Sequence, residues 1–575
     1  MRKLLLLGAL LAVSVSQAQV KNEGTVIKLV NKDWTSFDPA HCYDVDCGEV
    51  LMNTTETLVF YDGARPDRLV PLLLRELPTR KGGGISADGK TYTLKLRPNL
   101  RFADGSPLTA EDVKYSLSRV VVYAASGGPG VLLTEPLLGR SGLMRASDAD
   151  YQKLDRAITV KGKDTVIFRL AKPFAPFLSA LAFPGHGIIS KAAAVKAGDW
   201  SGTARDWKKF NAADPADSPF NTKGPLGSGP FVLERYDTGK TVVLARNARY
   251  WRSPASLQRV ILQNTPEETT AVQMLKNGDA DILMSVSDAR VDEIRALEGV
   301  KYSTYPALAV ISMHLNRKIN TSGSNVLGSG KLDGKGIPAD FFADRDLRAA
   351  FAYAFDYGAF VKDVLRGGGH QQNNALIEGM PGFDPKGPRY TLDLERSRQL
   401  FQKAWKGQVW EKGFVLPVFF SSGQPVRQRM VEILKRNVES INPKFRVEVR
   451  EVQDSQIDAM GARRQLSLWV GGYFADYADP HSVIQGLLES GGLYPQQVSY
   501  KNPEVDRLIH AAVDETDPAK RATLYRKIAR MGFDDVAEIP VFQPLNKAIQ
   551  RDWISGRVLN PVFSGTDYFY TIRKQ

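Results

Sequence analysis

Cysteine is almost absent from this sequence: of 575 residues, only Cys42 and Cys47 carry a thiol. Beyond residue 18, no stretch is apolar and long enough to cross a bilayer, which takes about 20 residues. These two scarcities exclude a disulfide-rich scaffold and an integral membrane protein. The composition, 43% hydrophobic and 24% charged, instead predicts a large folded protein with several domains or lobes.

Catalytic motifs are also missing. The sequence contains no H-E-x-x-H, no C-x-x-C and no G-x-S-x-G, and its six histidines are scattered without the spacing of a helical metal site. We therefore expect no enzyme, no metal site and no cofactor. A secreted hydrolase, with a nucleophile and base drawn from distant positions, is the alternative from another functional class.

The excess of basic side chains is moderate. There are 76 Lys and Arg residues against 63 Asp and Glu, which gives a net charge of +13. A basic surface can attract nucleic acid or anionic lipid. The basic residues are spread along the whole chain, however, and no basic run alternates with aromatics. We therefore expect a generally basic surface and no nucleic-acid partner.

The first residues have the pattern of a secretory signal peptide. Arg2 and Lys3 precede an apolar run over residues 4–15, and Ser16-Gln17-Ala18 places small side chains before Gln19. The run is too short for a membrane anchor, and no cysteine stands at the cut to accept a lipid. We expect cleavage after Ala18 and an exported, soluble periplasmic protein that is not a lipoprotein.

Four residues intervene between the two cysteines, in a segment that also contains His41, Asp44 and Asp46. In an oxidising compartment two close thiols usually pair, provided that their Cα atoms come within about 7 Å. The alternatives are free thiols, or a metal site that joins Cys42 and Cys47 to the three other residues. Zinc sites usually draw on a second pair of ligands elsewhere, so we predict a local disulfide.

Short strands alternate with helices along the chain, as in an α/β protein. Apolar or alternating runs predict strands over residues 25–30, 92–96, 166–170 and 445–449. Apolar spacings of three and four predict a helix capped by Thr109 and Asp112, and further helices over 344–365 and 430–441. Residues 318–338 are rich in Gly, Ser and Asn and predict a surface loop.

Four segments together resemble the peptide-type solute-binding proteins of ABC importers, family 5, which include the periplasmic dipeptide- and oligopeptide-binding proteins. They are residues 96–113 (LRPNLRFADGSPLTAEDV), 227–231 (GSGPF) with 246–251 (RNARYW), 275–282 (LKNGDADI) and 344–351 (DRDLRAAF). Ser228, Phe231 and Ala248 depart from the Thr, Tyr and Pro that are more usual in the family. Spacing and order agree over nearly the whole mature chain. We expect most of these segments to be structural.

One further segment, residues 472–480 (GYFADYADP), is similar to the pocket motif of that family and follows a predicted strand over 466–470. The resemblance implies that Asp476 pairs with the α-ammonium of a peptide, because a carboxylate that is desolvated when the lobes close forms a stronger ion pair. It also implies that three aromatic residues line the wall: Tyr473, Phe474 and Tyr477. The alternative is that Asp476 caps the next helix, although Asp479 before Pro480 is the better cap.

The resemblance also implies two α/β lobes that face a cleft and are joined by two chain crossings, with an extra subdomain on the first lobe. After the signal peptide at 1–18, lobe I comprises 19–63, 220–305 and 533–575, the extra subdomain 64–219, and lobe II 306–532. Closure about the crossings would bury a ligand. The loop between the two cysteines falls near the cleft edge, so Tyr43 and Asp44 are further pocket candidates.

The function that the resemblance implies is the capture of a short peptide and its delivery to the permease subunits of an ABC importer, by a monomer. The same fold in this family also serves nickel complexes, haem, opines and, in some members, oligosaccharides. An aromatic pocket would suit a sugar as well as a peptide. The fold therefore does not settle the ligand.

Overall fold

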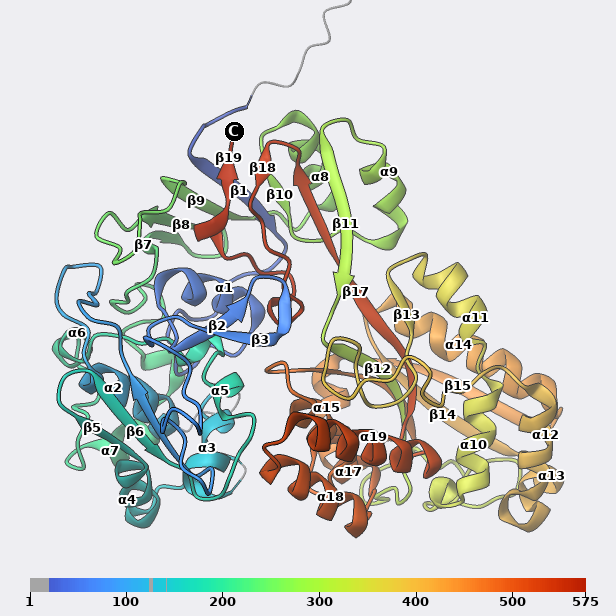
Figure 1. The fold of residues 1–575 in the computed structure, drawn as a ribbon. Helices are drawn as coiled ribbons and strands as arrows, with labels where there is room; N and C mark the ends of the chain where they lie inside the picture. The colour runs from blue at the N-terminus through green and yellow to red at the C-terminus, as the bar shows by residue number, and fades with distance from the viewer. Residues whose placement is uncertain (1–19, 124–127, 141) are drawn as a thin grey trace, which may run out of the picture.

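The computed structural model describes residues 20–123, 128–140 and 142–575, and its largest element is a twelve-stranded mixed sheet (Figure 1). Most of its strands form one continuous order, the main path, while β11 (Val300–Pro306) and β13 (Gly369–Gln371) pair with β17 outside that order. The main path, in spatial order, consists of β15 (Phe445–Val452), β14 (Phe414–Ser421), β16 (Leu468–Phe474), β12 (Ala309–Leu315), β17 (Ile539–Arg551), β10 (Ile282–Leu283), β1 (Thr25–Val30), β9 (Arg259–Asn264), β8 (Thr241–Arg246) and β7 (Phe231–Asp237).

Two chain segments join the halves of this sheet in the part of the chain that the structure describes. One is β17, whose first residues pair with β12 and β13 and whose last residues pair with β10 and β11. The other connects β11 to β12. There the Ala307 N–H donates to the Pro544 carbonyl at 3.0 Å, and the Gln543 side chain donates to the Ala307 carbonyl at 2.8 Å. Figure 1 shows β11 and β17 side by side. Paired crossings of this kind allow two lobes to bend about a hinge.

Helices cover both halves of the sheet. The half that contains β1 carries α1 (Val45–Thr54), α8 (Glu268–Asn277) and α9 (Val291–Arg295). The half that contains β12 carries α10 (Arg345–Ala354), α11 (Tyr357–Ala359), α12 (Leu394–Lys403), α13 (Gln408–Lys412), α14 (Pro425–Ile441), α15 (Asp454–Ala462), α16 (Pro480–Leu488), α17 (Leu493–Val498), α18 (Pro503–Asp514) and α19 (Pro518–Asp534).

The helix predicted over 430–441 is confirmed by α14, which buries the apolar face that its spacing predicts, from Met430 to Ile441, and leads into β15. The single helix predicted over 344–365 is wrong. Helix α10 ends at Ala354, because the next residue, Phe355, is extended with a ψ of 133°. Asp356 then caps α11 by accepting the Ala359 N–H at 2.9 Å. Aspartate competes for backbone hydrogen bonds in this way, so it favours a cap over a helix interior.

The region between β3 and β7 folds around a small sheet of β4 (Thr91–Lys95), β6 (Thr165–Arg169) and β5 (Ile158–Lys161). The β2–β3 hairpin (Val59–Asp62 and Arg65–Pro71) leads into it. Its helices are α2 (Ala110–Val122), α3 (Val131–Leu138), α4 (Asp148–Ala157), α5 (Phe177–Ala180), α6 (Lys191–Lys196) and α7 (Trp207–Asn211). The predicted cap of Thr109 and Asp112 opens α2.

A buried ion pair fixes this region to the N-terminal segment. Arg119, on α2, donates to the two carboxylate oxygens of Asp38 at 2.6 and 2.7 Å and to Asp199 at 2.5 Å. All three side chains are buried. Burial opposes the ionisation of Asp38, but the Arg119 guanidinium outweighs it and lowers the pKa of Asp38 to about 2. The pair therefore holds α2 beside the segment that leads into α1.

The segment 227–231 is structural, as predicted. Buried Glu56 accepts hydrogen bonds from Ser228, Tyr250 and Trp251 at 2.9, 2.7 and 2.6 Å. A Cβ atom at Gly229 would lie 2.5 Å from the carbonyl oxygen of Asn53, so only glycine fits there. These contacts join residues 227–231 and 246–251, two segments that carry the family resemblance, around the carboxylate of Glu56.

Over the described residues, no helix combines the length and the apolar character that a membrane crossing requires. The predicted signal peptide at 1–18 and its cut after Ala18 lie outside those residues. The boundaries of the two lobes and of the extra subdomain stay a prediction.

Candidate functional site

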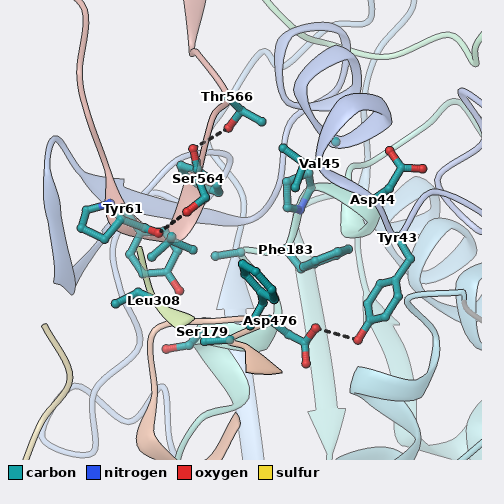
Figure 2. Close-up of a pocket in the computed structure, with 18 residues that line it drawn as sticks. Tyr43, Asp44, Val45, Tyr61, Ser179, Phe183, Leu308, Asp476, Ser564 and Thr566 are labelled. Atoms are coloured by element: carbon teal, nitrogen blue, oxygen red, sulfur yellow. Dashed lines mark hydrogen bonds between the residues drawn. The ribbon is translucent and has the colours of Figure 1, made fainter. Parts of the chain in front are cut away.

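A pocket with about 840 Å³ of empty space lies where distant parts of the chain meet (Figure 2). Its lining comes from the start of α1, from β2, from the segment after α5, from the β11–β12 crossing, from the end of β16 and from the C-terminal segment. The lining residues are Tyr43, Asp44, Val45, Gly48, Tyr61, Ser179, Ala182, Phe183, Pro184, Leu308, Phe474, Ala475, Asp476, Pro561, Val562, Phe563, Ser564 and Thr566.

Asp476 is the half-buried carboxylate of this pocket. The Tyr43 hydroxyl donates to its Oδ1 at 2.7 Å, and its own N–H donates to Ser482 Oγ at 2.9 Å (Figure 2). Burial raises the pKa of Asp476 to about 6, although the hydrogen bond from Tyr43 opposes the rise. Among the described residues the carboxylate forms no ion pair. A cation that entered the pocket would therefore meet a carboxylate whose charge no protein group neutralises.

The rest of the wall is largely apolar and aromatic. Phe183 packs against Tyr43 with ring centroids 5.4 Å apart, and Phe563 meets Tyr61 edge-on at 5.6 Å. Such surfaces bind the apolar parts of a ligand, while a few polar groups fix its orientation.

A buried charge network holds the C-terminal part of this wall in place. Lys28 Nζ donates to Glu49 Oε1 at 2.6 Å, to Asp567 Oδ2 at 2.8 Å and to the Gly565 carbonyl at 2.7 Å. Asp567 also pairs with Arg557 at 2.5 Å. The network joins β1 and α1 to the chain at 561–566, so the pocket has a fixed wall on that side.

The structure places Phe474 and Tyr473 on opposite faces of β16. Strand β16 extends to Phe474, beyond the predicted end at residue 470, and successive side chains on a strand point to opposite faces. Phe474 lines the pocket and is 59% exposed. Tyr473 packs instead against α16, where a Cβ at Gly486 would lie 2.1 Å from its ring. The prediction that Tyr473 lines the wall is therefore corrected.

Tyr477 is also absent from the described lining. It is only 4% exposed, and its hydroxyl lies 3.0 Å from His481 Nδ1 in the core. Asp479 caps α16 by accepting the His481 N–H at 2.9 Å, as predicted. Asp476 is not that cap, so its carboxylate stays available to the pocket.

The two remaining candidates lie in the cysteine loop. The structure joins Cys42 to Cys47 by a disulfide, with Cα atoms 5.7 Å apart. Between them, Tyr43 and Asp44 both line the pocket, and Asp44 caps α1 by accepting the Cys47 N–H at 2.8 Å. In the described part of the chain, no group of three possible ligands forms a metal site.

Several lining residues carry no signal in the sequence. Phe183, Tyr61 and the C-terminal segment around Phe563 lie far from the pocket motif along the chain, and each aromatic is typical of an ordinary core residue. Only the fold brings them to Asp476.

A pocket at the junction of two lobes, with paired crossings beside it, is the arrangement by which solute-binding proteins enclose a ligand. The chain belongs to the bacterial extracellular solute-binding proteins, family 5: the profile of that family's middle region matches residues 68–494. The resemblance stated from the sequence is thereby confirmed.

Two relatives show how far the similarity extends. The probable D,D-dipeptide-binding periplasmic protein DdpA of Escherichia coli is 26% identical over 491 residues, which cover 85% of this chain and 83% of that protein. The heme-binding protein A of Haemophilus influenzae is 23% identical over 495 residues, covering 85% of this chain and 82% of that protein.

A solved structure has the same fold. The periplasmic binding protein DppA of Helicobacter pylori, in complex with the peptide STSA, superposes with a TM-score of 0.72 at 20% identity, over 96% of this chain and 98% of that one. The predicted fold class, two α/β lobes of the periplasmic binding-protein type, is thus confirmed.

Proposed function

We propose that this protein captures a short peptide in the pocket beside Asp476 and delivers it to the permease subunits of an ABC importer. One observation carries the proposal: a half-buried carboxylate without a cationic partner among the described residues, in a largely apolar pocket.

The chemistry of the site suits the amino end of a peptide. An ammonium group can donate to the Asp476 carboxylate while the Tyr43 hydroxyl keeps its hydrogen bond to Oδ1. Hydrogen bonds between two charged groups are about twice as strong as neutral ones. The ring of Phe474 and the wall around Phe183 then contact the side chains of the peptide. Asp44 adds a second negative charge at the rim.

The cellular setting is part of the proposal. The names of two relatives describe a probable D,D-dipeptide-binding periplasmic protein and a dipeptide-binding protein, and the N-terminal sequence has the pattern of a signal peptide. We propose an exported monomer, cleaved after Ala18, that binds its ligand without a cofactor and without catalysis. N-terminal sequencing of exported protein should begin at Gln19, and recovery only in the membrane fraction would contradict free export.

Mass spectrometry of the ligand that stays bound through native purification tests the proposal. We expect short peptides with a free amino end. The identified peptide should also raise the melting temperature of the purified protein, because a ligand that binds only the folded state stabilises it. Recovery of a sugar, a haem or a metal complex in place of a peptide would contradict the proposal.

A further inference from the structure

A second cavity lies in the region between β3 and β7, separate from the pocket beside Asp476 (the Asp476 pocket). It has about 440 Å³ of empty space, against about 840 Å³ in the Asp476 pocket, and the two share no lining residue. Its walls come from one face of α2, from α4, and from the start of α6 and the segment that follows it. The lining residues are Glu111, Lys114, Tyr115, Ser118, Tyr151, Leu154, Asp155, Lys191, Trp200 and Gly202.

Aromatic rings form much of the wall of this cavity. The rings of Tyr115 and Trp200 stack with centroids 5.8 Å apart, and Tyr151 meets Trp200 edge-on at 6.3 Å. All three side chains are buried. Gly202 keeps the space beside them open, because a Cβ there would lie 3.0 Å from the Tyr115 ring and 3.2 Å from Lys191 Cε. Aromatic walls of this kind contact the apolar face of a ligand, while a few polar groups fix its orientation.

Two hydroxyl groups of the lining have no hydrogen-bond partner among the described residues. Ser118 Oγ is buried, and Ser118 is only 4% exposed, on the face of α2 that also carries Tyr115. The Tyr151 hydroxyl, on α4, is the second. The large majority of buried polar groups in proteins are hydrogen-bonded. Two hydroxyls without a protein partner in one cavity therefore indicate a ligand that forms hydrogen bonds with them.

Four charged side chains belong to the same lining, two of each sign. Lys114 pairs with Asp155 at 2.7 Å. Lys191 and Glu111 lie 4.0 Å apart, which is too long for a hydrogen bond, and neither side chain forms one with another described residue. An ion of either sign would be attracted by one member of this loose pair and repelled by the other. The site therefore favours a neutral ligand that both donates and accepts hydrogen bonds.

We propose that this cavity binds a neutral polyhydroxylated molecule the size of one sugar ring. Each hydroxyl group both donates and accepts, so such a molecule can accept from Lys191, donate to Glu111 and bond to Ser118 and Tyr151. Its carbon-bound hydrogens then contact the aromatic wall. The inference goes beyond the proposed function, because it concerns a different cavity and a different class of ligand.

Saturation-transfer-difference NMR of the exported protein tests the inference, because this method detects weakly bound small molecules. The probes are D-glucose, D-galactose and myo-inositol, and L-alanine is the zwitterionic comparison. We expect saturation transfer to at least one of the three polyols, and less to L-alanine. The signal should persist in Asp476→Asn, because that variant changes only the Asp476 pocket.

Variants of the lining make the test specific. Lys191→Met keeps an unbranched side chain and removes the charge, so it should weaken binding of the same polyol about tenfold or more. Ser118→Ala and Tyr151→Phe each remove one hydroxyl and should weaken it about fivefold. Lys196→Met is the matched control, because Lys196 is an exposed lysine of the same helix, α6, outside the lining. It should bind the polyol normally, and peptide affinity should stay unchanged in all four variants.

Absence of saturation transfer to all three polyols would overturn the inference, and so would a stronger signal from L-alanine. Equal binding by Lys191→Met and Lys196→Met would overturn it as well. A polyol signal that disappears in Asp476→Asn would place the sugar in the Asp476 pocket, which would contradict both this inference and the peptide proposed there. The other three results would leave the proposed function standing.

Discussion

Tyr43 and Asp476 meet across the cleft: the hydroxyl of Tyr43, in the disulfide loop before α1, donates to Asp476, which follows β16, at 2.7 Å. The two residues belong to opposite halves of the sheet. Their hydrogen bond therefore forms only when the halves are close together. It also favours the ionised form of the carboxylate, which a ligand's ammonium requires, against the burial that raises the pKa of Asp476.

Removing this hydroxyl should raise the pKa of Asp476 above about 6, because the hydrogen bond favours the ionised carboxylate. In Tyr43→Phe, the midpoint of the pH profile of peptide affinity should rise by about one pH unit, which corresponds to one hydrogen bond of roughly 1.4 kcal/mol. Calorimetry across pH 5–8 measures it. Tyr61→Phe, which changes another hydroxyl of the same pocket, should leave the midpoint in place. An unchanged midpoint in Tyr43→Phe would refute this role.

Peptide affinity of the wild type should depend on pH through Asp476. Burial raises the folded-state pKa of Asp476 to about 6. The protonated carboxyl therefore stabilises the ligand-free fold, and this contribution to the free energy of unfolding is lost as the pH rises through about 6. Peptide binds the ionised form and restores that stability. Affinity should be constant near pH 7 and should fall about tenfold per pH unit well below 6. A flat profile between pH 4.5 and 7.5 would mean that Asp476 does not bind the amino end.

Asp38→Ala should destabilise the protein by about 3–5 kcal/mol, because it leaves the buried Arg119 guanidinium without its bidentate partner. Urea unfolding measures the loss. The control is Asp67→Ala, at the exposed pair with Arg65, which should cost less than about 1 kcal/mol. The depressed pKa of Asp38 means that its contribution is present above about pH 4 and is lost as the pH falls through about 2. Equal losses in the two variants would contradict this account.

The disulfide between Cys42 and Cys47 should be formed in the exported protein. Intact-mass analysis under denaturing, non-reducing conditions with an alkylating agent should show no modified thiol, and prior reduction should expose two. Because Tyr43 and Asp44 lie inside the disulfide loop, reduction should also weaken peptide binding. Two alkylated cysteines without reduction would contradict the pairing.

The sequence predicts the local structure of this chain better than its pocket. The capping box at Thr109 and the helix before β15 follow from short-range patterns, and the structure has both. Tyr473 was misplaced because β16 continues through residue 474, so Tyr473 and Phe474 lie on opposite faces of the strand and cannot both line one wall. The contributions of Phe183 and Phe563 come from long-range packing that no local pattern contains. Asp476 could be predicted only through the family's motif.

The central claim is that Asp476 binds the positive amino end of a peptide. Asp476→Asn tests it most directly, because it keeps the size of the side chain and removes only its charge. Truncating one partner of a buried charge pair costs about 2–5 kcal/mol, so the peptide identified from native purification should bind Asp476→Asn about 30-fold or more weakly. The wild type should bind the N-acetylated peptide equally poorly, and Asp458→Asn, at an exposed aspartate on α15, should bind normally. Tight binding by Asp476→Asn, or of the acetylated peptide by the wild type, would contradict the claim.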